Sequence, residues 1–194
     1  MINLLYGAYR SARDAAWQCL IDYKITALPV PLKPITEQAG IKVIADSSVH
    51  LLSPGERGRA EMIGHDWLII VNDEDSPAAR RYTIAHELGH IFLGHDVRKG
   101  YTGHVRSYRF VVKPQTESEA DVFAARLLCP AVILWALDLH TAAEIAAACN
   151  VTMSCAHIRA ERMAELYRRG KFLTSPLERQ VYENFRGFIE THRA

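Results

Sequence analysis

The distribution of apolar residues along the chain predicts a mixture of strands and helices. Residues 59–64 and 67–72 are rich in β-prone side chains, and the Gly64–Asp66 segment between them suits a tight turn, so together they predict a β-hairpin. From residue 77 onwards the apolar positions recur at helical spacing, of which Ile84 and Leu88 are an example. Both patterns in one short chain indicate an α+β protein.

Start and stop signals bound the central helix. Ser76 is a suitable N-cap, and Pro77 fits the first helical position because its missing N–H would have no partner there. We expect this helix to run to about His95. The other predicted helices cover residues 3–24, 115–128, 130–139, 141–149, 152–169 and 176–190, with a short helical turn at 35–40, a strand at 42–49 and a short strand at 108–112.

Length and proline content suggest three regions. The 194 residues suit one compact domain with a small appendage. Prolines follow the first predicted helix and mark a connector. The expected division is an N-terminal helix with its proline-rich connector at 1–34, an α+β domain at 35–130 and a helical C-terminal region at 131–194.

Composition narrows the classes of function. The chain has 23 basic and 22 acidic residues, so its net charge of +1 gives no general reason to expect binding to nucleic acid or to a membrane surface. No apolar run of about eighteen residues occurs. Arg10, Arg13 and Asp14 interrupt the segment that a secretory signal would need. The four cysteines form no C-x-x-C pair, so we expect reduced thiols, no metal binding by cysteine and a cytoplasmic location.

The most informative feature is the sequence His86-Glu87-Leu88-Gly89-His90 within the predicted central helix. Histidines four residues apart lie on one face of a helix, one turn apart, so both imidazoles can reach the same metal ion. Glu87 can then face a water molecule activated by that metal. This H-E-x-x-H spacing is the arrangement of zinc metallopeptidases.

A catalytic zinc usually has three protein ligands, so a third must come from elsewhere in the chain. The helix predicted at 115–128 offers Glu117, Glu119 and Asp121. Glu117 and Asp121 are four residues apart and share a face. Glu117 would bind the metal, and Asp121 would accept a hydrogen bond from the far nitrogen of a ligand histidine. Glu119 is the second choice as ligand.

Two residues just after the motif are rival ligands. Asp96 follows His90 by six residues, but the glycine that a metzincin pattern needs is displaced by one position. His95 is interpreted instead as a cation at the C-terminus of the helix, where the macrodipole favours positive charge.

Three segments resemble the ImmA/IrrE family of metallopeptidases. They are Arg81–His90 (RYTIAHELGH), Glu117–Pro130 (ESEADVFAARLLCP) and, more loosely, Val151–Arg159 (VTMSCAHIR). The second differs from the family's usual E-x-x-A-N/D-x-F-A-x-x-L-L-M-P string by Cys129 in place of methionine, which is a tolerable change in a core. The resemblance covers about residues 41–170.

The resemblance implies a zincin-like fold of gluzincin type in the 35–130 domain, with a small twisted sheet over two helices. It implies that His86, His90 and Glu117 bind zinc (Zn2+) and that Glu87 is the catalytic base. It also implies a cytoplasmic, site-specific endopeptidase. Characterised members act on helix-turn-helix repressors and relieve repression of stress or mobile-element genes, so such a repressor is the expected partner.

Peptide hydrolysis also needs a hydrogen-bond donor for the developing oxyanion. Tyr101, His104 and Tyr108 lie in a segment after the motif and are the candidates, with no preference among them. The strand at 67–72 is a candidate edge with which an extended substrate could pair.

Residues 141–163 support a different hypothesis. They predict two helices joined by a tight turn, as in helix-turn-helix DNA-binding proteins, with Arg159 and Arg162 on the second helix. Glu161 and Glu165 interrupt the basic face, so a helical bundle is favoured over a DNA-binding unit. Binding of DNA or of a partner protein through this region is the alternative function.

Overall fold

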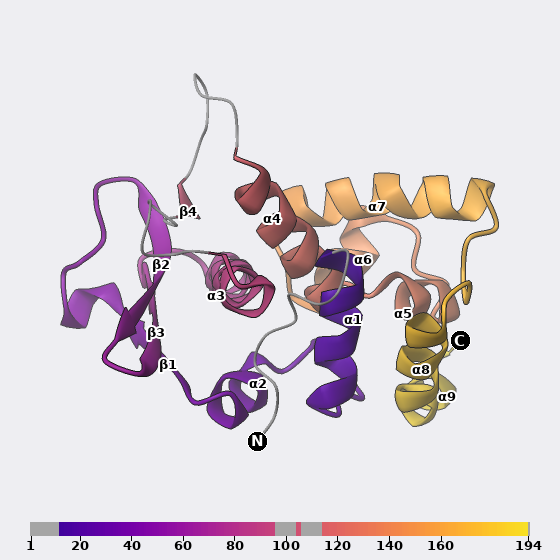
Figure 1. Ribbon diagram of the computed structural model, residues 1–194. Coiled ribbons are helices and arrows are strands. Elements are labelled where there is room, and N and C mark those ends of the chain that lie inside the picture. The colour runs from indigo at the N-terminus through magenta and orange to yellow at the C-terminus, as the bar shows by residue number, and fades with distance from the viewer. Residues whose placement is uncertain (1–11, 96–103, 106–113, 194) are drawn as a thin grey trace. The chain divides into compact units, whose positions relative to one another are not determined.

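The computed structural model describes residues 12–95, 104–105 and 114–193 (Figure 1). The chain divides into two compact units. The first comprises residues 1–15 and 32–124, and the second comprises residues 16–31 and 125–194. The sheet and the H-E-x-x-H helix belong to the first unit, and the second unit is helical. The α+β class predicted from the sequence is confirmed.

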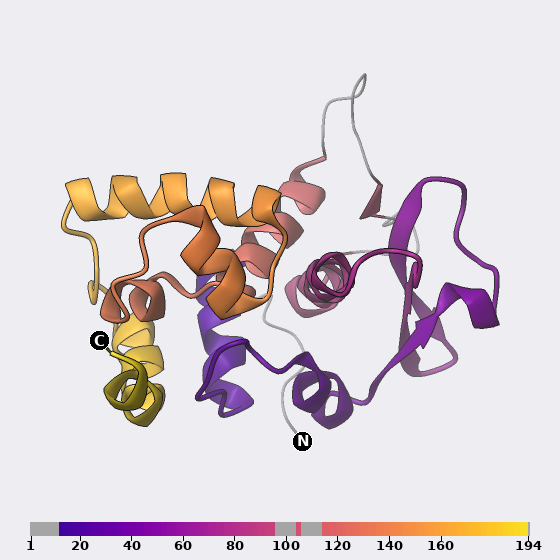
Figure 2. The ribbon, with the colours of Figure 1, turned by 180° about the vertical axis from the view of Figure 1, so that it is seen from behind.

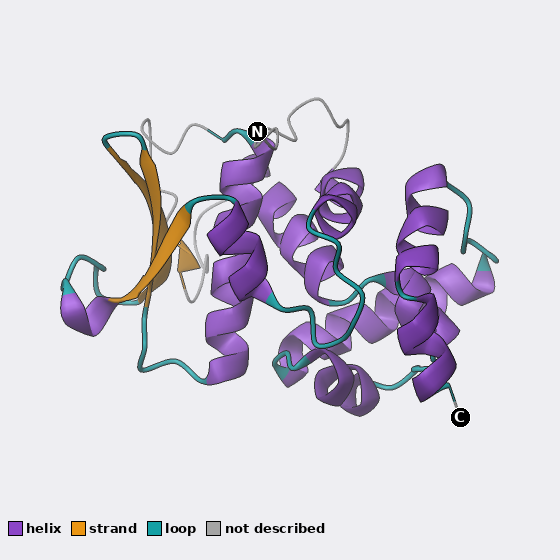
Figure 3. Cartoon of the chain, turned by 90° about the horizontal axis from the view of Figure 1, so that it is seen from below, coloured by secondary structure: helices purple, strands orange, loops and turns teal. Residues whose placement is uncertain are grey.

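The first unit contains the sheet (Figure 3). Among the described residues this sheet has four strands, in the order β1-β3-β2-β4. β2 (Glu56–Ile63) and β3 (Asp66–Val71) form the predicted antiparallel hairpin, and Gly64 takes a positive φ of 65° in the turn between them. β1 (Ile41–Ala45) pairs in parallel with β3, and the short β4 (His104–Val105) pairs antiparallel with β2.

Two strand predictions differ from the structure. β3 has a neighbour on each side, so the expectation that residues 67–72 form an edge is wrong. Pairing on both sides satisfies the backbone groups of this apolar run. The strand expected at 42–49 is shorter, because Asp46 begins a short 3-10 helix and its carboxylate accepts hydrogen bonds from the amides of Leu51 and Leu52.

α3 (Pro77–Leu93) packs against β2 and β3 and carries the H-E-x-x-H motif (Figure 3). Its start is as predicted, because the hydroxyl of Ser76 accepts a hydrogen bond from the amide of Ala79 at 3.3 Å. Gly94 ends the helix by taking a left-handed conformation, with φ of 69°. α2 (Leu32–Gln38) lies beside β1.

The first part of α4 (Gln115–Leu128) lies against α3 at Gly89. A β-carbon on Gly89 would be 3.1 Å from the Cα of Ala120 and 3.2 Å from the Cβ of Phe123. The buried rings of Phe92 and Phe123 meet edge to face, with centroids 6.0 Å apart. The missing side chain at residue 89 therefore allows the two helices to approach closely.

The second unit contains most of α1 (Ala12–Asp22), the end of α4 and, among the described residues, five further helices (Figure 2). The helix expected at 176–190 is two helices, because the chain leaves helical geometry at Phe185, where ψ is 2°. The rings of Trp135 and Phe172 stack, with centroids 5.3 Å apart. The five helices are α5 (Ala131–Ala136), α6 (Ala142–Cys149), α7 (Met153–Arg168), α8 (Pro176–Asn184) and α9 (Arg186–His192).

Arg159 is a buried anchor of the second unit. It is 4% exposed, and its Nε donates a hydrogen bond of 2.8 Å to the backbone carbonyl of Cys129. That carbonyl directly follows α4, where carbonyl groups need partners from outside the helix. Arg159 thus joins α7 to the end of α4 and does not lie on the surface that the DNA-binding hypothesis requires.

Each compact unit combines two segments that are separated in the sequence. Residues 16–31 belong to the helical unit although they precede the sheet. The division at residues 34 and 130 stays a prediction about independently folding domains. Residues 1–11, which include the first part of the helix expected at 3–24, and the strand expected at 108–112 lie outside the described residues.

Two structural findings concern the cysteines and the apolar segments of the chain. All four cysteines are free thiols, as the sequence led us to expect. Within the described ranges, no helix combines the length and the apolar character that a membrane crossing requires.

Replacing Gly89 by Ala should destabilise the protein. The new methyl group forces Ala120 or Phe123 to move by a few tenths of an ångström, and such overpacking lowers the free energy of unfolding by about 1–3 kcal/mol. Ala has a higher helix propensity than Gly, and this gain offsets roughly 1 kcal/mol of the lost free energy of unfolding at most. Urea unfolding measures the difference. Gly187→Ala is the control, because a β-carbon there meets nothing within 4 Å. Equal stability of the two variants would contradict the packing argument.

Acid should remove stabilisation that depends on Glu56, which is 1% exposed. Burial alone would raise the pKa of Glu56, but hydrogen bonds from Arg59 and Ser53 lower it below its ordinary 4.5. The charged form therefore stabilises the fold above pH 4.5, and this contribution is lost as pH falls through the lower folded-state pKa. Urea unfolding across this range should show a smaller acid-dependent loss in Glu56→Gln than in wild type. The control is Glu161→Gln, which removes an exposed carboxylate on α7 outside this network and should keep the wild-type dependence.

Candidate metal centre

Three side chains from two helices converge at one buried point. His86 and His90 come from successive turns of α3, and Glu117 comes from the first turn of α4. The Nε2 atoms of the two histidines are 3.1 Å apart. The carboxylate of Glu117 spans them, with Oε2 3.3 Å from Nε2 of His86 and Oε1 3.2 Å from Nε2 of His90. Both histidines are fully buried, and Glu117 is 3% exposed.

These atoms fit the donor set of a metal ion. In a tetrahedral zinc site with ligand distances of about 2.0–2.1 Å, neighbouring ligand atoms lie about 3.3–3.4 Å apart. The three separations in this cluster are close to that value. Two imidazole nitrogens and one carboxylate are also a ligand set of catalytic zinc, which keeps its fourth position for water or substrate.

Hydrogen bonds fix the orientation of His86. Its Nδ1 lies 2.9 Å from Oδ1 of Asp121, which also accepts a hydrogen bond of 3.1 Å from the hydroxyl of Tyr82. A proton on Nδ1 leaves the lone pair of Nε2 directed at the centre of the cluster. Asp121 lies where the sequence placed it, on the face of α4 that carries Glu117. Tyr82 was missed, although its i,i+4 spacing from His86 puts the two on one helix face.

The same contacts shift the pKa values of the three converging side chains. Burial by itself lowers the pKa of His86, but hydrogen bonds to Asp121 and Glu117 outweigh burial and raise it to about 9. Burial lowers the pKa of His90. Burial opposes ionisation of Glu117, yet its hydrogen bonds with both histidines hold its pKa well below the usual range. The cluster therefore favours a positive charge at its centre, whether a proton or a metal ion.

Glu87 is next to His86 in sequence and is fully buried. Among the residues that the structure describes, neither of its carboxylate oxygens has a hydrogen-bond partner. Burial raises the pKa of Glu87 to about 8. A buried carboxylate without partners does not serve stability, and beside candidate metal ligands it is typical of a catalytic acid–base group.

Glu119 and His95, which the sequence offered as less favoured ligands, contact each other and are not in the converging group. Glu119 places its Oε2 3.1 Å from Nε2 of His95 and is not part of the group that converges, so the carboxylate in that group is Glu117. Nδ1 of His95 lies 3.0 Å from Nδ1 of His90. His95 therefore contacts the candidate centre through His90, which its interpretation as a helix-end cation did not anticipate.

The oxyanion candidates stay predictions. His104 lies in β4, beside β2, but its side chain is outside what the structure describes. Tyr101 and Tyr108, like the rival ligand Asp96, lie outside the described residues.

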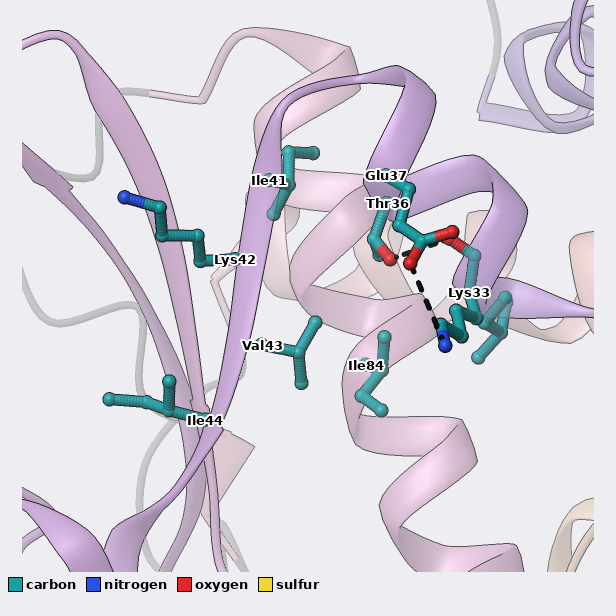
Figure 4. Close-up of a pocket in the computed structure, with 9 residues that line it drawn as sticks. Lys33, Thr36, Glu37, Ile41, Lys42, Val43, Ile44 and Ile84 are labelled. Atoms are coloured by element: carbon teal, nitrogen blue, oxygen red, sulfur yellow. Dashed lines mark hydrogen bonds and ion pairs between the residues drawn. The ribbon is translucent and has the colours of Figure 1, made fainter.

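A separate pocket in the first unit is lined by α2, β1 and one residue of α3 (Figure 4). Its volume is about 580 Å³, and the residue from α3 is Ile84. An exposed ion pair between Lys33 and Glu37, 3.7 Å long, belongs to its lining. No residue of the converging group lines this pocket, so the two features are distinct.

Comparison with known proteins agrees with the geometry. Residues 36–161 match the model of a peptidase family that is described as the IrrE N-terminal-like domain. No curated protein and no solved structure matches the chain. Because the family match spans well over half of the 194 residues and includes the whole cluster from His86 to Glu117, the chain belongs to this IrrE N-terminal-like peptidase family.

Proposed function

We propose that this protein is a zinc-dependent, site-specific endopeptidase that acts in the cytoplasm on a helix-turn-helix repressor. The observation that carries the proposal is the convergence of His86, His90 and Glu117 on one buried point, with the unpartnered carboxylate of Glu87 next in sequence. Membership of a peptidase family supports peptide hydrolysis as the reaction. The repressor substrate and the cytoplasmic location rest on the resemblance to the ImmA/IrrE family.

Each residue has a defined part in the proposed reaction. His86, His90 and Glu117 would hold zinc, which supplies Lewis acidity for activating water and polarising the scissile carbonyl. The carboxylate of Glu87 accepts a proton from the attacking water and delivers it to the leaving nitrogen. Because burial raises the pKa of Glu87, its carboxylate holds a proton more readily than an exposed one, which suits this transfer. Asp121 keeps the ring of His86 in one orientation.

The DNA-binding alternative has less support. α6 and α7 correspond to the two helices on which it was based, and Arg162 is exposed on α7. Arg159, however, is buried against the carbonyl of Cys129, and the exposed Glu161 stands beside Arg162. The exposed face of α7 is therefore not uniformly basic, which a phosphate-binding helix would require.

Replacing Glu117 by Ala should abolish zinc binding. Two imidazoles alone do not complete the usual three-ligand set, so wild type should retain about one zinc per chain and the variant almost none. Elemental analysis after zinc loading and gel filtration measures this. Glu161→Ala removes an exposed glutamate outside the cluster and should bind zinc like wild type. A wild-type chain without zinc after loading would contradict the proposed centre, and a zinc-loaded Glu117→Ala would contradict the role of Glu117.

Replacing Glu87 by Gln should stop hydrolysis while zinc stays bound. Loss of the proton acceptor lowers the rate about 100-fold to 10,000-fold. The fold should persist, because the raised pKa of Glu87 means that the folded chain favours a neutral side chain at this position. Zinc-loaded proteins are incubated with purified helix-turn-helix repressors, and cleavage is followed by mass spectrometry.

Glu161→Gln is the matched control for this experiment and should cleave like wild type. Undiminished cleavage by Glu87→Gln would disprove the role of Glu87. If zinc-loaded wild type cleaved none of the repressors, the substrate class would be refuted and the metal centre would stand on its zinc content.

A further inference from the structure

On its Nδ1 side, His90 has a chain of hydrogen-bond partners that differs from the partner of Nδ1 in His86. Its Nδ1 lies 3.0 Å from Nδ1 of His95. Nε2 of His95 lies 3.1 Å from Oε2 of Glu119, and Gln115 donates a hydrogen bond of 2.7 Å to Oε1 of the same carboxylate. We call the continuous chain from His90 through His95 to Glu119 the His95 relay.

The end of α3 places His95 for this contact. After the left-handed Gly94, the amide of His95 donates a hydrogen bond of 3.0 Å to the carbonyl of His90. The two rings meet edge to face, with centroids 5.0 Å apart and planes inclined by 73°. The side chain of His95 is only 9% exposed, so water competes little for its Nδ1.

Metal binding by Nε2 of His90 fixes which atoms of His90, His95 and Glu119 donate and which accept along the relay. When Nε2 of His90 is a metal ligand, the ring proton is on Nδ1, so Nδ1 donates. Nδ1 of His95 must then accept, which puts the proton of the neutral His95 ring on Nε2. The carboxylate of Glu119 can accept this proton's hydrogen bond and lies at the right distance. The whole relay thus favours the tautomer of His90 whose Nε2 lone pair is free.

Hydrogen bonds that lead to a carboxylate therefore orient both candidate ligand histidines. His86 contacts Asp121 directly, whereas His90 reaches Glu119 through the ring of His95. Both carboxylates come from α4, which also carries Glu117. Glu119 points away from the face that Glu117 and Asp121 share, and the ring of His95 bridges that separation.

We propose that His95 and Glu119 are positioning residues that hold His90 in its metal-binding tautomer and raise the affinity of the centre for zinc. This inference rests on the proposed zinc site and adds two residues to it. Neither residue touches the metal or the substrate. They act by fixing the ring of His90 before zinc binds, so that less conformational freedom is lost on binding.

The test is a zinc titration of the full chain in competition with a chromophoric chelator. His95→Ala should weaken zinc binding about 10-fold to 100-fold, as loss of a partner of a ligand histidine typically does. His95→Gln should restore most of the affinity, because its amide oxygen can accept from His90 and its amide nitrogen can donate to Glu119. His65→Ala, which removes an exposed histidine in the β2–β3 turn, should bind zinc like wild type.

A double-mutant cycle tests whether the two residues act in series. Glu119→Ala should weaken zinc binding less than His95→Ala, because Glu119 acts through His95 and its side chain is 39% exposed. The variant with both changes should bind zinc no more weakly than His95→Ala alone. In nitrogen-15 spectra of the imidazoles, zinc-loaded wild type should show the ring proton on Nδ1 of His90 and on Nε2 of His95. Thermal unfolding without zinc verifies that each variant is folded.

Each outcome decides between the relay and its failure. Wild-type affinity in folded His95→Ala would overturn the relay and leave the zinc peptidase standing. Additive losses in the double variant, or equal losses in His95→Ala and His95→Gln, would overturn it as well. If the wild-type chain bound no zinc, the relay and the proposed function would both be overturned.

Discussion

The close approach of α3 and α4 at Gly89 is the contact on which the candidate metal centre depends. A side chain at this position would meet the backbone of Ala120 and the β-carbon of Phe123 at 3.1–3.2 Å. Because the helices lie so near each other, Glu117 reaches between the imidazoles of His86 and His90. The geometry of the centre is therefore set by the packing of two helices, which are more rigid than loops.

Burying the polar groups of the centre costs free energy, which the hydrogen bonds of Glu117 and Asp121 with the histidines offset. The centre gathers buried imidazoles and carboxylates, and Glu87 has no hydrogen-bond partner among the described residues. Burying such groups opposes folding unless charge or hydrogen bonds compensate. The apolar residues around them, Leu88, Phe92 and Phe123, are completely buried and supply the stabilisation that holds the polar groups in place. A cation at the centre would compensate the remaining charge.

Features that depend on residues close in the chain were predicted better than features that depend on distant residues. The start of α3 at Ser76 and the β2–β3 hairpin were predicted correctly, because caps and turns depend on residues close in the chain. The interior position of β3 was not predicted, because strand order depends on pairing with the distant β1. The burial of Arg159 was also missed, since its partner, the carbonyl of Cys129, is thirty residues away. A basic residue on a predicted helix says nothing by itself about which face is covered.

The sequence by itself determined the α+β class, the helix with His86 and His90, and the short set of acidic residues from which a third ligand would come. Each of these follows from the pattern of residues close together in the chain, with period two for strands and about 3.6 for helices, which is a local property. Only the tertiary structure decided that Glu117 completes the cluster while Glu119 turns to His95. That choice depends on how two helices cross and on where the chain turns after Gly94, and neither is encoded in the spacing of residues along one helix.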